Sequence, residues 1–402
     1  MVDRFKQAVM LGLGYIGLPT AALMAKGGIK VLGVDVNRQI VDTVNKGEIH
    51  IVEPELGGLV RYVIDKKLLK ASTKPSPSDV FLIAVPTPFK DDHVPDISFV
   101  ESATRMIIPY LEEGNLFIIE STSPILTTEK MASLIFKERP ELKDKIYIAY
   151  CPERVLPGNV IYELENNDRV IGGVNEESTE AAVSFYSKFV KAELHKTNAR
   201  TAEMCKLVEN SSRDVNIAFA NELSLICDNA GINIWELIKL ANKHPRVNIL
   251  QPGTGVGGHC IAIDPWFIVS DFPDEAKIIR TAREINNYKT LWVVEKIKNS
   301  ILRFVKEHSR KPGVALMGLA FKPNIDDLRE SPAKFVVEQM LVFNQAEYFV
   351  VEPNVGTFSN IELKYFEDAH SQADIVVFLV AHKEFFNLPK KQAELDFCGI
   401  RK

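Results

Sequence analysis

Short apolar runs alternate with longer helix-like stretches through the first half of the chain. Runs with the length of buried strands lie at residues 8–13, 31–34, 80–85, 116–120 and 146–149. The segment between the first two runs, residues 20–26, has the character of a helix. Strands that alternate with helices in this way form doubly wound parallel sheets. We therefore predict a Rossmann-like, dinucleotide-binding domain at residues 1–195.

The pattern changes after residue 200. Long helical patterns cover residues 202–230 and 276–305, with a glycine-rich loop at 252–258 between them. Further strand-like runs, around a helical segment at 333–343, lie at residues 313–318, 347–351 and 375–380. The fold class predicted is α/β, with two doubly wound Rossmann-like domains joined by a helical middle domain that contains a long helix. The middle domain is placed at residues 196–310 and the last domain at 311–402.

Composition narrows the class of protein. The chain has 402 residues, of which 46% are hydrophobic and 25% are charged, values typical of globular proteins. A net charge of −5, without a block of basic residues, argues against a nucleic-acid partner. The apolar runs are far shorter than the roughly 18 residues of a membrane span. Five scattered cysteines without a C-x-x-C pair predict neither a disulfide framework nor a metal site, and we expect a cytoplasmic protein.

A glycine motif follows the first predicted strand. Residues 12–17 read G-x-G-x-x-G between a strand and a helix, the context in which this motif binds a dinucleotide pyrophosphate. Asp35 ends the second strand, where a carboxylate binds the adenosine ribose and repels a 2′-phosphate. The pair favours NAD over NADP, although Arg38 lies close in sequence to Asp35. The alternative is a turn that is only rich in glycine.

Thr87 and Thr122 each follow an apolar strand, so both are expected at the carboxyl edge of the sheet, where ligands of open α/β folds bind. The structural alternative is that they cap helices. The residues we predict to contact the cofactor from this domain are Gly12, Gly14, Tyr15, Ile16, Gly17, Asp35, Thr87 and Thr122.

Cys260 is the candidate nucleophile. Four glycines between Pro252 and Gly258 precede it, and Asp264 follows. We expect the glycines to let the backbone approach a bulky ligand and to expose the thiol. A lone cysteine is more often a small buried hydrophobic residue. His259 is a less favoured candidate for a general base, because adjacent side chains need not face one another.

Three more polar residues are candidates for the same chemistry. Lys206 and Asn210 lie four apart on one face of a predicted helix, and Glu203 shares that face with Lys206. Such a face is usually solvated, but a lysine and an amide in a cleft stabilise an oxyanion. Glu153 follows the strand at 146–149 and is either a solvated loop carboxylate or a base that activates water.

Taken together, these motifs resemble the UDP-glucose/GDP-mannose dehydrogenase family along essentially the whole chain. The matching residues are G-x-G-Y-x-G-L at 12–18, the Pro-Glu pair at 152–153, Lys206 with Asn210, G-G-x-C-x-x-x-D at 257–264, and G-x-A-F-K with R-E-S within 318–331. Segments 259–268 and 321–329 look like the branch that oxidises UDP-N-acetyl-D-mannosamine. The nearest alternatives are dehydrogenases of UDP-N-acetylglucosamine or UDP-glucose.

The resemblance implies an NAD-dependent, four-electron oxidation of the sugar C6 to a carboxylate. Cys260 would capture the aldehyde as a thiohemiacetal, and the thioester formed next would be hydrolysed with help from Glu153. Lys206 and Asn210 would stabilise the oxyanion, and Asp264 would hold the water or Lys206. A lysine near the thiol would also favour the thiolate.

The resemblance also implies a UDP-sugar site, a homodimer and a product used for surface polysaccharides. Arg246 would reach the site of the neighbouring subunit, and Arg329 would lie near substrate and cofactor. The remaining residues expected at the substrate are Arg154, Val155, Leu156, Lys206, Asn210, Arg213, Gly257, His259, Phe321 and Lys322.

Two other classes share the predicted first domain. A two-electron 3-hydroxyacid dehydrogenase has the same architecture at the front but no need for a cysteine flanked by glycines. A dinucleotide-sensing or scaffolding protein would bind NAD without turnover, and gives Glu153, Lys206 and Cys260 no common role.

Overall fold

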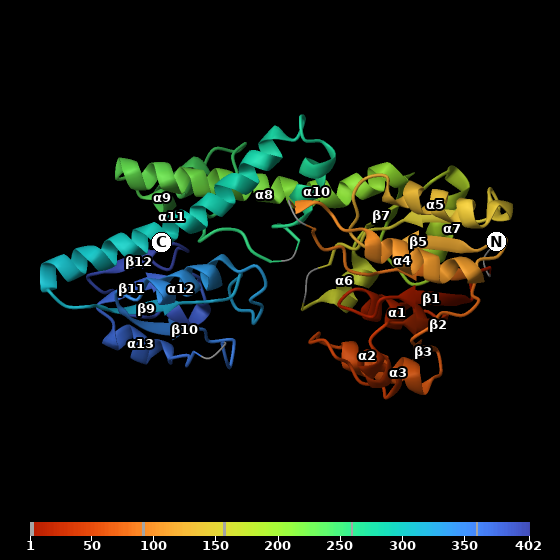
Figure 1. Ribbon diagram of the computed structural model, residues 1–402, viewed down its shortest axis with the longest axis horizontal. Coiled ribbons are helices and arrows are strands. Elements are labelled where there is room, and N and C mark those ends of the chain that lie inside the picture. The colour runs from red at the N-terminus through yellow and green to blue at the C-terminus, as the bar shows by residue number, and fades with distance from the viewer. Residues whose placement is uncertain (1–3, 91–92, 156–157, 259, 359–360) are drawn as a thin grey trace. The chain divides into compact units, whose positions relative to one another are not determined.

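The computed structural model describes residues 4–90, 93–155, 158–258, 260–358 and 361–402. The chain forms two compact units, Met1–Val208 and Glu209–Lys402. Figure 1 shows the elements of each. Among the described residues, no helix combines the length and the apolar character that crossing a membrane requires.

The first unit is built on a sheet whose eight described strands lie in the order β3-β2-β1-β4-β5-β6-β7-β8. The strands are β1 (Gln7–Leu11), β2 (Lys30–Val34), β3 (Leu69–Ser72), β4 (Val80–Ile83), β5 (Leu116–Ile119), β6 (Tyr147–Tyr150), β7 (Arg169–Gly173) and β8 (Leu194–Asn198). All neighbours are parallel except β6 and β7, which run antiparallel with Ala149 opposite Gly173. The doubly wound sheet predicted from the alternating pattern is therefore confirmed, with one reversed strand.

Both faces of this sheet are buried, which explains its continuous apolar runs. The helices of the first unit are α1 (Gly17–Lys26), α2 (Arg38–Asn45), α3 (Leu56–Asp65), α4 (Ser98–Ile107), α5 (Thr127–Glu138), α6 (Val160–Asn166) and α7 (Glu176–Tyr186). Successive residues of β1 serve different cores. Met10 packs in the core that includes α1, and Val9 packs in the core that includes α4 and α5.

Strands β3, β7 and β8 carry no apolar run long enough to predict them. Edge strand β8 reads Leu-His-Lys-Thr-Asn and none of its residues is fully buried. It nevertheless pairs with β7 over its whole length, so the sheet continues past residue 195. Pairing of the backbone, which a hydrophobic pattern does not report, forms this strand.

The second unit combines helices with a smaller parallel sheet in the order β10-β9-β11-β12. The strands are β9 (Gly313–Met317), β10 (Glu347–Val351), β11 (Ile375–Phe378) and β12 (Glu394–Asp396). This order repeats that of β2-β1-β4-β5 in the first sheet, so the second Rossmann-like domain is confirmed as a half of that fold. The helices are α8 (Ala199–Ala230), which crosses from the first unit, α9 (Ile234–Ala241), α10 (Asp264–Asp271), α11 (Lys277–His308), α12 (Pro332–Phe343) and α13 (Phe366–Gln372).

Helix α11 belongs to the core of the small sheet. Val293, Ile297 and Ile301 recur on one face of the helix and pack with Val314 and Leu316 of β9. The helical middle segment and the last sheet therefore share one apolar core, which accounts for their clustering into a single unit. The long helix predicted for the middle domain is represented by both α8 and α11, each of 32 residues.

Candidate active site

The glycine turn between β1 and α1 has the form of a dinucleotide site. Gly12 has φ +90°, and a Cβ there would lie 2.3 Å from the carbonyl oxygen of Ala84. A Cβ on Gly17 would lie 1.9 Å from the carbonyl oxygen of Gly12. The fold itself thus requires the first and third glycines. Gly14 has nothing within 4 Å of such a Cβ, so its backbone is open to a phosphate at the N-terminus of α1.

Asp35 lies directly after β2, beside this turn. Its Oδ2 accepts a hydrogen bond from the Leu13 N–H at 3.0 Å, and its Oδ1 accepts from the Asn37 N–H at 2.9 Å. These bonds fix the carboxylate where a ribose hydroxyl binds in this fold. Arg38 pairs with Asp42 at 3.1 Å on exposed α2. The turn and the carboxylate together fit NAD, and Tyr15 is exposed on the same turn.

Thr87 and Thr122 join the loops after β4 and β5. The Thr87 hydroxyl donates to the Thr122 carbonyl oxygen at 2.7 Å. Helices α4 and α5 have Ile97 and Leu126 at their N-cap positions, so neither threonine caps a helix. The structural alternative considered from sequence is therefore wrong, and both residues do lie at the carboxyl edge of the sheet.

Glu153 follows β6 at the same edge but is only 8% exposed. Its Oε2 pairs with Nη1 of Arg169 at 2.9 Å, and its Oε1 accepts from the Arg154 N–H at 2.7 Å. It is therefore not a solvated loop carboxylate. The Arg154 guanidinium donates to the Asp168 carbonyl oxygen, Val155 packs against the core of the first unit, and Leu156 lies outside the described residues.

Two residues that support this loop were not found from sequence. Arg169 is the first residue of β7, and Glu53 accepts from the N–H groups of Gly158 and Val160 at 2.9 and 2.8 Å, at the start of α6. The sequence signals that mark them are an arginine at the head of the short run R-V-I-G-G at 169–173 and a glutamate between Val52 and Pro54. Neither signal identifies the partner.

Helix α8 makes two polar contacts, one through the amide of Asn210 and one through the carboxylate of Glu203. Asn210 donates through Nδ2 to Oδ2 of Asp264, the first residue of α10, at 2.5 Å. Lys206 lies one turn earlier on the same face. Glu203 is fully buried and accepts from the N–H groups of Leu126 and Thr128 at 2.7 and 2.8 Å, so it is part of the interior and not of a solvated face.

Cys260 is exposed, and its carbonyl oxygen accepts from the Asp264 N–H at 2.8 Å. The thiol therefore belongs to the turn that leads into α10. Burial raises the pKa of the Cys151 thiol to about 12, and it also raises the pKa of Cys227 and of Cys398. Cys260 is the one exposed cysteine of the five, and exposure is a property that a reactive thiol needs. His259 lies outside the described residues.

The glycines before Cys260 pack closely against other parts of the chain. A Cβ on Gly255 would lie 2.2 Å from Oγ1 of Thr290, and one on Gly257 would lie 2.5 Å from the carbonyl oxygen of Glu330. One on Gly258, whose φ is +82°, would lie 2.8 Å from the ring of Phe321. The loop packs so closely against its own chain that the fold itself excludes a side chain at these three glycines.

A chain of buried polar groups also anchors this loop. The Gly253 N–H donates to Oδ1 of Asn221 at 2.9 Å, and Asn221 donates to Oδ1 of Asn286 at 2.9 Å. Asn286 donates to Oδ1 of Asp214 at 2.8 Å, and Arg283 donates to the same oxygen at 2.6 Å. The sequence signal for this network was polar residues within the buried faces of α8 and α11. Apolar periodicity alone does not show which of these polar residues contact one another.

The remaining predicted substrate residues of the second unit are mostly at its surface. Lys322, Arg329, Arg213 and Arg246 are exposed, and Phe321 is partly buried against Gly258. Arg329 pairs with Asp327 at 2.7 Å. No single contact within the described residues of this unit joins all of them.

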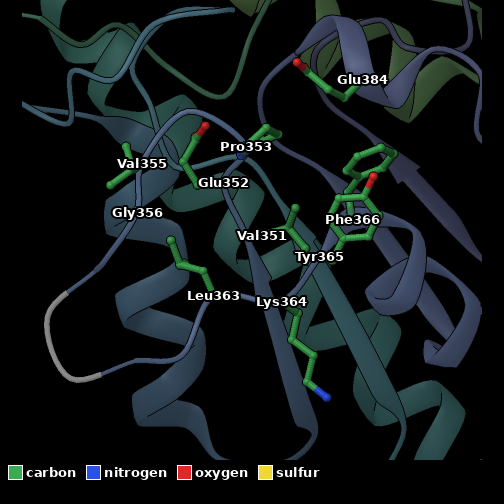
Figure 2. Close-up of a pocket in the computed structure, with 10 residues that line it drawn as sticks. All are labelled: Val351, Glu352, Pro353, Val355, Gly356, Leu363, Lys364, Tyr365, Phe366 and Glu384. Carbon is green, nitrogen blue, oxygen red and sulfur yellow. The ribbon is translucent and has the colours of Figure 1, made fainter.

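A cavity of about 460 Å³ lies at the carboxyl end of β10. Figure 2 shows Glu352 and Glu384 at its wall and the Lys364 side chain extending away from them. Glu352 accepts from the N–H groups of Leu319 and Ala320 at 2.8 and 2.9 Å, and contacts Nε2 of His382 at 3.1 Å. The Lys364 amine lies 4.9 Å over the Phe349 ring. Lys364 is the one cation among the ten described lining residues, and its side chain extends away from the two glutamates (Figure 2).

The Rossmann sheet, the G-x-G-x-x-G turn and Asp35 together define an NAD-binding protein. Residues 6–190, 200–288 and 315–396 match the NAD binding, central and UDP binding domains of the UDP-glucose/GDP-mannose dehydrogenase family. The chain belongs to this family and is an NAD-dependent nucleotide-sugar dehydrogenase.

Individual relatives match this chain over at least 92% of their own length. UDP-N-acetyl-D-mannosamine dehydrogenase of Campylobacter jejuni is 53% identical and aligns over 99% of this chain and 100% of that protein. NDP-N-acetyl-D-galactosaminuronic acid dehydrogenase of Ralstonia nicotianae is 52% identical over 96% of this chain and 92% of its own. The structure of UDP-D-ManNAc dehydrogenase from Pyrococcus horikoshii superposes with a TM-score of 0.87 at 37% identity, covering 98% of this chain and 96% of that one.

Proposed function

We propose that the chain oxidises C6 of UDP-N-acetyl-D-mannosamine to the carboxylate of UDP-N-acetyl-D-mannosaminuronate, through a covalent intermediate on Cys260. The observation that carries the proposal is the exposed Cys260 thiol in the turn before α10, in a chain whose Campylobacter jejuni relative is named for this substrate. In this proposal, residues 1–195 bind the cofactor, residues 196–310 form the central domain and residues 311–402 bind the UDP-sugar.

Cys260 is the residue that retains the sugar between two oxidations. Bound NAD supplies the hydride acceptor for each of them. The thiol adds across the C6 aldehyde, so that sulfur bonds to carbon and a proton passes to oxygen, giving a thiohemiacetal. Its oxidation gives a thioester, and water then replaces the sulfur and restores the thiol. One alcohol and one water thus yield one carboxylate, two NADH and three protons.

The hydrolysis is assigned to polar residues around the thioester. Glu153 removes a proton from the attacking water, and Lys206 and Asn210 stabilise the oxyanion. Asp264 supports this assignment, because its hydrogen bond at 2.5 Å fixes the Asn210 amide and leaves the second N–H of that amide as a donor. Asp264 is 3% exposed, which suits a group that orients another.

The same proposal covers the remaining contacts. Arg154, Val155, Leu156, Arg213, Gly257, His259, Phe321 and Lys322 bind the UDP-sugar, and Arg329 lies near the cofactor. Arg246 completes the site of a second copy in a homodimer. The enzyme works in the cytoplasm and supplies a uronic acid for surface polysaccharide synthesis.

The substrate is tested by NAD reduction with four nucleotide sugars. UDP-N-acetylmannosamine is expected to give the highest kcat/KM and two NADH per sugar consumed. UDP-N-acetylglucosamine and UDP-glucose are the alternatives from the family. UDP-N-acetylgalactosamine tests the configuration suggested by the name of the Ralstonia nicotianae relative. A higher kcat/KM for any of these three rejects the mannosamine assignment, while one NADH per sugar rejects the four-electron reaction.

A further inference from the structure

Glu153 is part of a buried cluster whose other members have no role in the reaction outlined above. Its other members are Glu120 after β5, Cys151 after β6, Arg169 at the start of β7 and Tyr186 at the end of α7. All five side chains are at most 8% exposed. Charged groups are seldom buried this deeply unless something compensates them.

Strand direction explains how Arg169 reaches this edge of the sheet. Strand β7 is antiparallel to β6, with Tyr150 opposite Gly172. Continuing that register beyond β6 brings Glu153 opposite Arg169. In a parallel strand, the first residue would lie at the opposite edge of the sheet.

The Arg169 guanidinium is held from several sides. Its Nη1 lies 2.9 Å from Oε2 of Glu153, its Nη2 donates to the Leu164 carbonyl oxygen at 3.3 Å, and its carbon lies 5.2 Å from the centre of the Tyr186 ring. The Tyr186 hydroxyl donates to Oε1 of Glu120 at 2.5 Å. Burial raises the pKa of Glu120 to about 7, so below that pH the carboxyl is largely neutral and Arg169 compensates Glu153 alone.

A gain in folding stability does not by itself explain why these polar side chains are buried together. Within the described residues, Oε2 of Glu120, Oε2 of Glu153 and Nε of Arg169 lack a hydrogen-bond partner. Buried ion pairs are often no more stable than apolar residues of similar size, and buried polar atoms are normally satisfied. What the cluster does achieve is to hold both carboxylate oxygens of Glu153, Oε2 by the ion-pair contact with Arg169 at 2.9 Å and Oε1 by the hydrogen bond from the Arg154 N–H at 2.7 Å.

We propose that Arg169 is a positioning residue for thioester hydrolysis, which holds the Glu153 carboxylate in the orientation that the attacking water needs. The proposal rests on the hydrolytic role given to Glu153 in the proposed function. A carboxylate oxygen in an ion pair retains further lone pairs, so Glu153 still accepts a proton from water. Arg169 itself does not touch the substrate.

The test compares Arg169→Lys and Arg169→Met with the wild type and with Glu153→Gln, using UDP-N-acetylmannosamine and NAD. We expect both Arg169 variants to keep the rapid first phase of NADH formation and nearly the same kcat/KM, because the apparent KM falls together with kcat when hydrolysis of the covalent intermediate is slowed. Their steady-state kcat should fall roughly 10- to 100-fold, within the range of a general base. Intact-mass spectrometry should find a sugar adduct on Cys260 that accumulates. Arg401→Lys, which alters a partly buried ion pair with Glu394, is the matched control and should show neither effect.

A double variant separates positioning from a merely structural role. If Arg169 acts through Glu153, adding Arg169→Met to Glu153→Gln should cost little further kcat. The same loss in both backgrounds, or a kcat within twofold of the wild type for both Arg169 variants, overturns the proposal. If Arg169→Met does not fold, Arg169→Lys decides. Wild-type turnover by Glu153→Gln would instead reject the hydrolytic role in the proposed function.

Discussion

Glu120 places a carboxyl group in the interior of the first unit, and its contribution to folding stability therefore depends on pH. Burial raises the pKa of Glu120 from 4.5 to about 7, against the attraction of Arg169. The unfolded chain therefore loses this proton at lower pH than the folded chain. The contribution of Glu120 to stability is complete below the unfolded pKa and is lost as the pH rises through the folded pKa.

For Glu120→Gln, we expect a flatter dependence of stability on pH. Between about pH 5 and about pH 8, the free energy of unfolding of the wild type should fall by about 2 to 3 kcal/mol more than that of the variant. Chemical denaturation of both proteins at the two pH values measures the difference. Parallel pH profiles would contradict the assignment of a raised pKa to Glu120.

At the scale of elements, glycine is needed in two turns of this chain for different physical reasons. In the turn after β1, Gly14 has open space where a side chain would start. In the loop before Cys260, Gly257 is closed in by the carbonyl oxygen of Glu330 and the Cβ of Phe321, at 2.5 and 2.8 Å from a Cβ built there. The first turn is shaped for a ligand and the second for packing against its own chain.

Alanine at each position should separate binding from folding. Gly14→Ala is expected to keep the thermal midpoint of the protein without cofactor and to weaken NAD binding about tenfold or more, because the new methyl group meets the pyrophosphate. Gly257→Ala is expected to lose about 2 kcal/mol of stability and several degrees of thermal midpoint. Calorimetric titration with NAD and thermal unfolding give both values. A Gly257→Ala protein with the wild-type midpoint would contradict the packing argument.

At the scale of the whole molecule, α8 carries large apolar side chains that the single chain leaves uncovered. Phe219 and Ile226 are 53% and 54% exposed and lie seven residues apart, on one side of the helix. Side chains of this kind on a helix that reaches from one unit into the other suit the homodimer that we propose, in which this face is covered by a second copy.

Charges placed on this face should dissociate the dimer. Phe219→Asp and Ile226→Asp are each expected to shift the protein from dimer to monomer in sedimentation velocity, since an unpaired carboxylate would be buried at the interface. Ile278→Asp, at a 72% exposed position of α11, is the control and should leave the dimer intact. A wild-type chain that sediments as a monomer would refute the proposed homodimer, and with it the role of Arg246.

The sequence was sufficient for those parts of the fold that rest on apolar periodicity, such as β4, β5 and the two long helices. It did not predict β8, whose polar residues are held by backbone pairing with β7, or the reversal of β7. Arg169 was missed for the same reason, because only the antiparallel register brings it to Glu153. The packing of Gly257 was not predicted because its neighbour Phe321 is distant in sequence, and contacts between distant residues leave no local pattern.

The central claim is that Cys260 carries the sugar covalently between the two oxidations. It is tested most directly by Cys260→Ser, with steady-state NADH formation measured from UDP-N-acetylmannosamine. The account predicts that steady-state NADH formation falls by at least about a thousandfold, since the serine hydroxyl is a far weaker nucleophile than a thiolate, while NAD binding is unchanged. Steady-state NADH production by this variant at the wild-type rate would contradict the covalent mechanism.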